Sequence, residues 1–522
     1  MSGERSSVMA MRGPRRCTDR PGRCARWVMA GALLLTTCAS AGRAETTASA
    51  PKPWWQEHIT LTASNRVRGE FVNWFEPSAQ YAAEGANQYN FMANQFRLGL
   101  RLTWPHVLFF AEMQDTSLVN LPNDASTNGT PPTDKRVGNL GPGGLYYVNT
   151  RDRDQNEPFL KQGYVTLTDL PQLKGVSATL GRIEYSDGLE VVPKDPALAQ
   201  LKRMRIGERL IGAFGYTHVT RSFDSVRGVY DTPEFNVTGW GSRPTQGGFE
   251  VSANPELDIW VAGLAATVKQ LPRLGASDAR WFYLYYEDDR DRAVKVDNRS
   301  EAARKADKQN IAIHTWGGHV LTVNEAGPGK CDGLVWGVVQ GGSWGEQSHF
   351  AWAYAVEGGY QFPAVWAAPW VRAGYNASSG DSDPNDNRHG TFFQLLPTAR
   401  LYAQFPFYNL MNVQDLFAQV LLKPVSQVLV RADYHWLQTT AAADRWYSGG
   451  GATNATFFGF AALNTNRDRD LAHLVDVSVT ATPLKWLTAY AYYGHAFGQG
   501  AVKQVFEGAN ADYGFVELTL RY

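Results

Sequence analysis

Cysteine is scarce in this chain of 522 residues, which contains only four. Three of them, Cys17, Cys24 and Cys38, fall within the first 44 residues, so Cys331 is alone in the remainder. A single cysteine forms no intrachain disulfide and no cysteine-rich metal site. The remainder of the chain must therefore be stabilised by secondary structure rather than by covalent cross-links.

Long apolar runs and an excess of positive charge are also missing. Beyond residue 44, no stretch approaches the run of about 18 apolar residues that a transmembrane helix needs. The 50 basic residues are matched by 50 acidic ones, and residues 45–522 carry 42 against 48, a formal charge of −6. These features argue against a helical membrane protein and against a nucleic-acid partner.

The first 44 residues have the order of a secretory signal peptide. A basic region precedes an apolar run from Trp27 to Leu35, and small residues then offer a cleavage site at Ala39-Ser40-Ala41 or Gly42-Arg43-Ala44. A mitochondrial presequence would not explain the compact apolar run. A lipoprotein modified at Cys38 is a further alternative, which the bulky Thr37 before it disfavours. We predict a signal peptide at 1–44, a short periplasmic segment at 45–57 and one β-barrel at 58–522.

Aromatic residues and glycine are abundant, with 17 Trp, 23 Tyr, 25 Phe and 50 Gly. Segment after segment alternates apolar and polar residues, as in 95–104, 475–482 and 516–522. This period of two is typical of β-strands with two different faces. It fits a soluble sandwich, with its apolar face inward, and equally a membrane barrel, with its apolar face toward lipid.

Loop lengths separate these two folds. Eighteen stretches read as strands, from 58–72 to 511–522 and including 208–220. Their connections mostly alternate between short links, such as those at Pro105, Pro424 and Pro483, and long polar segments at 116–157, 185–207, 232–256, 378–412 and 439–467. Outer-membrane barrels sort their loops in this way, with short periplasmic turns and long external loops. The final aromatic residue, Tyr522, is also typical of that class. The sequence thus predicts an all-β transmembrane antiparallel barrel of about 18 strands in the outer membrane of a Gram-negative bacterium.

Three groups of motifs resemble the alginate-export family of outer-membrane barrels, and together they span roughly residues 58 to 522. The first group is Leu180-Gly181-Arg182-Ile183-Glu184-Tyr185, Arg209-Leu210-Ile211-Gly212 and Arg221-Ser222-Phe223-Asp224. The second is Ser379-Gly380-Asp381-Ser382-Asp383-Pro384-Asn385-Asp386, then Thr391-Phe392 and Leu395-Leu396-Pro397. The third is Leu471-Ala472-His473 and Tyr492-Tyr493-Gly494-His495-Ala496-Phe497-Gly498. The resemblance implies an 18-stranded monomeric barrel with an arginine-rich lumen that passes a polyuronate.

Arginines on the polar faces of the expected strands are the candidate substrate path. The planar guanidinium matches a carboxylate and stays charged at any working pH. The candidates are Arg66, Arg68, Arg97, Arg101, Arg182, Arg372, Arg400 and Arg431. Acidic residues share these faces, so the alternative for each arginine is an ion pair that braces the wall. Arg97 and Arg101 are the stronger candidates because no acid shares their own strand face, whereas Arg431 lies two residues from Asp433. Arg182 has the parity of the lipid-facing Leu180 and fits the lumen only if the register shifts.

Other chemistry has weaker support. The acidic loop with Asp381, Asp383, Asn385 and Asp386 invites a calcium interpretation, but Asp386 and Phe392 replace the glycine and the final glutamate of the calcium-loop pattern. A solvated acidic loop is the preferred interpretation. The string 341–345 matches a nucleophile elbow without its strand-to-helix context. Residues 288–310 are of mixed charge and expected to be exposed, with a short helix at 300–309.

We predict a channel that passes an anionic polysaccharide, alginate-like by the resemblance, or related anionic sugars by passive diffusion. It is not expected to be an enzyme or to need a cofactor. Outer-membrane lipid is the expected surrounding, and periplasmic export machinery is a further candidate partner. Two alternatives remain open: a general porin for small solutes, and a barrel closed by its long loops that binds or anchors.

Overall fold

The computed structural model describes residues 53–79, 81–125, 139–397 and 401–522, so the expected signal peptide lies outside it. Residues 54–522 form one compact unit. Its wall is made of β1 Ile59–Asn73, β2 Gln88–Thr103, β3 Val107–Val119, β4 Gln155–Leu170, β5 Leu173–Ile183, β6 Phe223–Asp231, β7 Phe235–Pro244, β8 Ile259–Val268, β9 Ala276–Asp288, β10 Ile311–Ala326, β11 Gly329–Trp344, β12 Gln347–Gln361, β13 Trp370–Ser378, β15 Val413–Val425, β16 Val428–Thr439, β19 Asp470–Leu484, β20 Leu487–Gly498 and β21 Asn510–Arg521.

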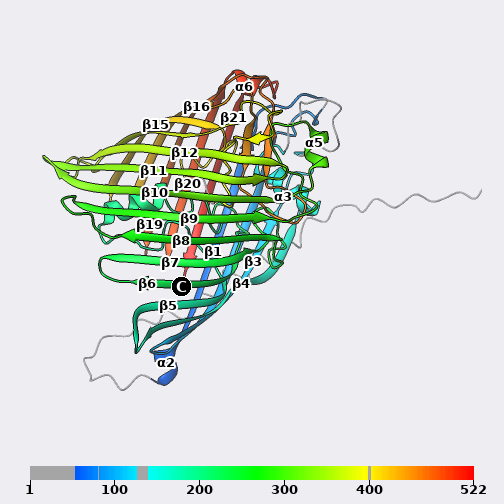
Figure 1. Ribbon diagram of the computed structural model, residues 1–522. Helices are drawn as coiled ribbons and strands as arrows, with labels where there is room; N and C mark the ends of the chain where they lie inside the picture. Colours follow the sequence, from blue (N-terminus) through cyan, green and yellow to red (C-terminus); the bar gives the residue numbers. More distant parts are fainter. Residues whose placement is uncertain (1–52, 80, 126–138, 398–400) are drawn as a thin grey trace, which may run out of the picture. The chain divides into compact units, whose positions relative to one another are not determined.

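These eighteen strands form a closed antiparallel barrel, because β1 pairs with β21 as well as with β2. Each other strand pairs with its neighbours along the chain, and Figure 1 shows β5 to β12 following one another in that order. Closure leaves the sheet no edge and pairs the backbone polar groups within the wall, which the interior of a membrane requires. The expected fold class is confirmed.

The expected strand order contains one strand that does not exist and lacks one that does, so the total of eighteen is still correct. Residues 208–220 do not form a strand of the wall, and β7 lies inside the segment 232–256 that reads as a loop. The sequence of β7 contains Gly239 and Gly241, which lower strand propensity. The alternation in 208–220 belongs instead to an almost wholly buried loop inside the barrel, which consists of turns and bends with positive φ angles at Glu208, Phe214 and Thr220.

The two ends of the barrel differ in the length of their connections. Strands β2 and β3, β4 and β5, β6 and β7, and four of the five later pairs at the same end are joined by no more than seven residues. The opposite end carries 74–87, 120–154, 184–222, 245–258, 289–310, 379–412, 440–469 and 499–509, with 345–346 as its single tight turn. Helices α3 Pro142–Thr150 and α5 Glu301–Ala306 lie at this external end in Figure 1. The expected arrangement, with short turns at one end and long loops at the other, is therefore confirmed.

Side chains alternate between the two faces of the wall along most of each strand. Leu180, Val226 and Val335 are 65%, 62% and 55% exposed, and they belong to the face that meets lipid. Their immediate neighbours Thr179, Ser225 and Leu334 are buried on the inner side. No helix within the described residues is both long and apolar enough to cross a membrane.

The interior is not empty, because the long external loops fold back into it. Elements inside these loops include α4 Pro196–Arg205, α6 Gly500–Lys503, β14 Arg388–His389 and the small sheet of β17 Trp446–Gly449 with β18 Phe460–Leu463. Aromatic side chains of several loops, among them Phe75, Phe405, Phe407 and Trp446, form one apolar cluster with inward-facing residues of the wall. The external part of the lumen therefore holds a packed core.

Candidate functional site

The loop 184–222 runs along the inner wall and is held there by polar side chains of the strands. The α4 helix begins after Asp195, whose carboxylate accepts a hydrogen bond of 2.8 Å from the backbone N–H of Leu198, an ordinary N-cap. Farther along, Arg66 and Arg68 of β1 donate to the carbonyls of Gly215 and Tyr216 at 2.9 and 3.0 Å. These bonds replace the strand ladder that the alternation in 208–220 had suggested.

The same segment continues across β2, β3 and β4. Gln95 and Gln114 donate to the carbonyl of His218 at 2.6 and 2.9 Å, and Lys161 donates to the carbonyl of Arg221 at 2.6 Å. Backbone groups buried inside a barrel need such partners, since an unpaired one would cost about 1–3 kcal/mol. These polar side chains of β1 to β4 therefore support the backbone of the loop.

A second loop, 379–412, meets the first one inside the barrel. The N–H of Gly212 donates to the carbonyl of Leu396 and the N–H of Leu396 donates to the carbonyl of Leu210, both at 2.9 Å. The third loop, 440–469, joins them, because Arg221 donates to the carbonyl of Gly450 at 2.8 Å. Three external loops therefore pack as one unit within the lumen, which we call the loop plug.

Glu357 of β12 ties this loop plug to the wall. Its carboxylate lies 3.1 Å from Nε of Arg205 in the first loop, and it accepts a hydrogen bond of 3.0 Å from the hydroxyl of Tyr402 in the second. It also accepts a bond of 2.9 Å from Arg372 of β13. The side chains of Glu357, Arg205 and Arg372 are 0% exposed. One buried carboxylate thus holds two loops and a neighbouring strand.

Arg209 completes this cluster without a carboxylate of its own. Its guanidinium lies over the ring of Trp336 at 4.1 Å, and it donates to the amide oxygen of Asn376 at 2.5 Å and to the hydroxyl of Tyr402 at 3.1 Å. Neither Arg205 nor Arg209 is among the arginines expected to line the path, although Arg209 opens one of the family motifs. They lie in the loop 184–222, whose path into the lumen the sequence pattern did not indicate.

Most of the predicted path arginines are paired with acids. Arg66 and Arg68 lie 3.7 and 2.8 Å from Glu517. Arg372 also binds Asp332 at 3.0 Å, and Arg431 binds Asp433 at 2.5 Å, as its spacing suggested. These four charges are compensated within the wall, so bracing describes them better than an open path.

Arg97, one of the two stronger candidates, is paired as well. Its guanidinium lies 2.9 Å from Glu184 and 3.5 Å from Glu112. Neither acid shares its strand, because Glu112 lies on β3 and Glu184 follows β5. The sequence of a single strand does not indicate such neighbours from other strands and loops.

Arg182 does not face the lumen, so its place among the lumenal residues is wrong. It lies on the outward side of β5 with Leu180, at the external edge of the barrel. There it forms a bidentate pair with Asp224 of β6 at 2.7 and 2.6 Å and donates to Asn254 at 2.7 Å. No register shift turns it inward. Arg400 lies outside the described residues.

Three lumen-facing arginines of the strands make no ion pair within the described part of the chain. They are Arg101, Arg227 and Arg521, each within a few residues of the end of its strand at the short-turn side. Arg101 and Arg521 are exposed and Arg227 is partly so. Sequence reasoning proposed Arg101 and missed the other two, although both alternate with the outward Val226 and Leu520 in the same way.

The wall between Arg101 and Arg227 carries aromatic and hydroxyl groups. The Arg101 guanidinium lies over the Phe110 ring at 5.6 Å, and this ring is 5.5 Å from that of Tyr164. Arg227 donates to the hydroxyl of Thr179 at 3.4 Å. Cations beside ring faces and hydroxyls suit a carboxylated sugar, which offers carboxylates and apolar ring faces. We call the three arginines Arg101, Arg227 and Arg521 the periplasmic arginine patch.

The carboxylates of the acidic loop 381–386 accept hydrogen bonds from the backbone of the same external loop. Asp381, Asp383 and Asp386 accept hydrogen bonds of 3.1, 3.0 and 2.9 Å from backbone N–H groups two residues ahead. Asp381 is buried beside Asp444, and its own N–H donates to that carboxylate at 2.8 Å. No group of three metal-binding side chains occurs among the described residues. The expectation of a fully solvated loop is wrong for Asp381.

The Asp381–Asp444 contact makes the loop plug sensitive to pH. Burial raises the pKa of Asp381 to about 7, with the charges of Asp444 and Asp386 acting in the same direction, and burial raises the pKa of Asp444 to about 6. Both pKa values lie above those of an unfolded aspartate, so this contact is most favourable below about pH 4 and weakens as the pH rises through about 6 to 7. Hydrogen exchange at 381–391, corrected for intrinsic rates, should be faster at pH 8 than at pH 5.

Two substitutions test the origin of that pH dependence. Asp381→Asn should flatten it, whereas Asp383→Asn, at an exposed position of the same loop, should leave it in place. An equal slope in wild type and Asp381→Asn would show that other groups control the loop.

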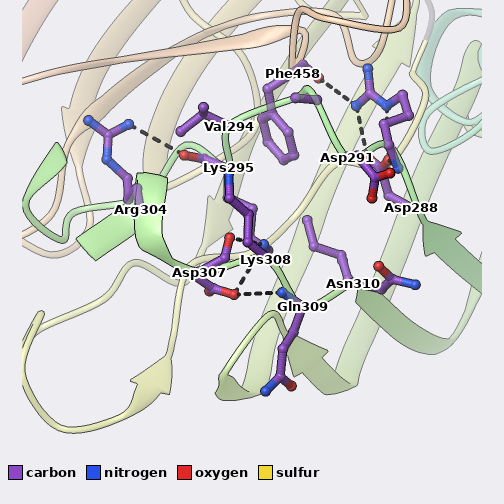
Figure 2. Close-up of a pocket in the computed structure, with 13 residues that line it drawn as sticks. Asp288, Asp291, Val294, Lys295, Arg304, Asp307, Lys308, Gln309, Asn310 and Phe458 are labelled. Atoms are coloured by element: carbon purple, nitrogen blue, oxygen red, sulfur yellow. Dashed lines mark hydrogen bonds and ion pairs between the residues drawn. The ribbon is translucent and has the colours of Figure 1, made fainter. Parts of the chain in front are cut away.

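The external loop 289–310 contains the short helix expected there, α5, but many of its charges are buried. Figure 2 shows Asp307 facing Lys295 and Gln309, and Lys295 donates to its carboxylate at 3.2 Å. Arg299 reaches the same carboxylate at 3.1 Å, and Arg290 binds Asp288 at 2.7 Å. The expected exposure of this segment is wrong for these residues, whose pairs stabilise the loop itself.

Comparison with solved structures supports the fold. OccK2 (OpdF) of Pseudomonas aeruginosa in complex with glucuronate is 7% identical, with a TM-score of 0.50, and the match covers 89% of this chain and 98% of that one. A BenF-like porin of Pseudomonas fluorescens Pf-5 is 10% identical over the same shares, with a TM-score of 0.52. OccK9 (OpdG) of Pseudomonas aeruginosa is 11% identical, with a TM-score of 0.52 over 89% and 99%. At these identities the likeness concerns the fold.

A search of curated proteins finds no match for this chain. The sequence model of the alginate export family, in contrast, matches residues 59–504, almost the whole barrel. Together with the closed barrel of eighteen strands, this match identifies the molecule as an outer-membrane channel of a Gram-negative bacterium. The chain belongs to the alginate-export family.

Proposed function

We propose that this channel passes an anionic saccharide, a polyuronate of the alginate type or a related carboxylated sugar. The observation that carries the proposal is the periplasmic arginine patch. Arg101, Arg227 and Arg521 face the lumen without an acidic partner in the described structure, whereas the other strand arginines that face it are paired. Uncompensated positive charge at a mouth raises the local concentration of anions.

The resemblance to a uronate-binding barrel supports the same ligand class. The solved structure of OccK2 holds glucuronate, a single carboxylated sugar, in a barrel of the same fold. A chain of such sugars would present carboxylates at regular intervals to successive arginines. Sites that are individually weak would let the polymer advance, since conduction requires release as well as binding.

The loop plug favours a channel that is closed at its external end in this conformation. The three loops share hydrogen bonds and an apolar cluster, and Glu357 ties two of them to the wall. Passage would then require a displacement of the loops, while the strands of the barrel keep their pairing. The loop-closed barrel is accordingly the second candidate function, and the plug is the observation that favours it.

Efflux from proteoliposomes distinguishes these functions. Vesicles containing the refolded barrel would be loaded with oligouronates or with neutral oligosaccharides of the same length. We expect the oligouronates to leave faster than the neutral oligomers. Equal rates would indicate a general porin for small solutes, and retention of both would indicate a barrel closed by its loops. A monomeric state and periplasmic export partners belong to the same proposal and would be tested by mass photometry and by cross-linking in cells.

A further inference from the structure

The lipid-facing wall is not uniformly covered by large side chains. Three small residues, Gly69 of β1, Ala491 of β20 and Gly514 of β21, lie close together where these strands run side by side. Phe71 pairs with Gly514, and Val516 pairs with Ala491 and with Gly69. All five lie on the outward face. An added Cβ at Gly69 would meet nothing within 4 Å, so the wall is open there.

Large side chains surround this floor and turn it into a hollow. Phe71, Val516 and Tyr493 are 59%, 54% and 51% exposed, and they stand beside Gly514 and Ala491. Val477 and Val479 of β19 continue the hollow on the far side of β20. A hollow lined by aromatic and aliphatic side chains suits a hydrocarbon chain. A chain that fills the hollow makes close van der Waals contacts with these side chains, which loosely packed lipid would not make.

A polar rim borders the hollow on the side of the external loops. Asp512 accepts a hydrogen bond of 2.6 Å from the hydroxyl of Tyr493 and one of 3.2 Å from the amide of Asn73, and it lies 2.7 Å from Nδ1 of His495. Gln88 and Asn90 of β2 border the same hollow. Asn73 is the last residue of β1, and β21 begins at Asn510, so the rim lies at the external end of these strands.

We infer that this hollow binds one acyl chain of an outer-leaflet glycolipid, lipid A, whose amide and hydroxyl groups meet the polar rim. The hollow is continuous with the lipid-facing surface of the barrel, which supplies the hydrocarbon surroundings. The rim offers amides, an imidazole and a carboxylate, which suit sugar hydroxyls and acyl amides. Its place at the external end corresponds to the leaflet that holds glycolipid. This site is independent of what the lumen transports.

Native mass spectrometry of the delipidated full-length barrel tests the inference. The protein would be titrated with lipid A, and in parallel with phosphatidylethanolamine. Wild type should retain one lipid A, and filling the floor with Ala491→Leu and Gly69→Leu should weaken retention at least tenfold, since a Cβ at Gly69 meets nothing within 4 Å. The matched control replaces two outward glycines elsewhere on the wall, Gly228→Leu and Gly337→Leu, and should retain lipid A as wild type does.

Further measurements keep the test decisive. Heat-dependent gel mobility shows whether each variant folds. If the double variant does not fold, the single variants Ala491→Leu and Asp512→Ala replace it, since they leave most of the wall unchanged. Each of them should weaken the retention of lipid A. Equal retention in wild type and the filled variants would overturn the inference. So would equal binding of phosphatidylethanolamine, or association of two barrels that the filled variants abolish, since the hollow would then serve a different occupant.

Discussion

Replacing Arg101 and Arg227 together by glutamine should strongly reduce the preference of the channel for anions, because only Arg521 of the three uncompensated arginines remains. These side chains face the lumen near its periplasmic end, and no acid pairs with them in the described structure. An exposed ion pair contributes up to about 1 kcal/mol. The double variant should therefore bind an oligouronate up to roughly 25-fold more weakly, about fivefold for each arginine. The reversal potential under a salt gradient, measured in planar bilayers, reports the loss of selectivity.

The control removes the same charge from positions that do not face the lumen. Arg273 and Lys485 lie in exposed periplasmic turns, and Arg273→Gln with Lys485→Gln should keep the wild-type reversal potential. If the control shifted the reversal potential as far as the Arg101 and Arg227 variant, general surface charge rather than the patch would set the selectivity.

Glu357→Gln should loosen the loop plug while the barrel stays folded. The substitution leaves Arg205 without its carboxylate and removes one of the two acids that compensate Arg372. Breaking a buried pair by removing one partner costs about 3–5 kcal/mol. That cost should fall on the loops, which are held by side chains, rather than on the backbone ladder of the wall. We expect faster cleavage of 184–222 and 379–412 by protease, and a larger or more often open conductance.

An exposed pair on the neighbouring hairpin provides the comparison for Glu357. Glu325 lies 3.1 Å from Lys330 and its side chain is 78% exposed, so Glu325→Gln should change stability by less than about 1 kcal/mol. It should leave both protease resistance and conductance as they are. Unchanged loops in the Glu357→Gln variant would mean that the apolar cluster alone holds the plug.

The wall of this protein could be predicted because its signal is local. A strand with one face toward lipid and one toward the lumen repeats every two residues, and the alternation around Leu98, Val477 or Leu518 follows directly from that geometry. The contents of the lumen carry no such signal. The segment 208–220 alternates as a strand does, yet its backbone is bound by Arg66, Arg68 and Gln95.

The same difference explains the outcome for the arginines. Parity along one strand predicted that Arg101 faces the lumen, and the same rule favoured the outward placement of Arg182, against its assignment to the path. Whether an arginine is free depends on residues of neighbouring strands and loops, such as Glu184 beside Arg97 and Glu517 beside Arg68. Glu357 shows the limit most clearly, since its partners Arg205 and Tyr402 are 152 and 45 residues away along the chain.

Block of single-channel current by alginate oligomers tests the central claim most directly. Oligomers would be added to the side of the periplasmic turns while the current through one refolded barrel is recorded. We expect block that increases with oligomer concentration, is absent with neutral oligosaccharides of the same length, and is weakened by Arg101→Gln with Arg227→Gln. Cation preference without any block by the oligomers would contradict a polyuronate path through the periplasmic arginine patch.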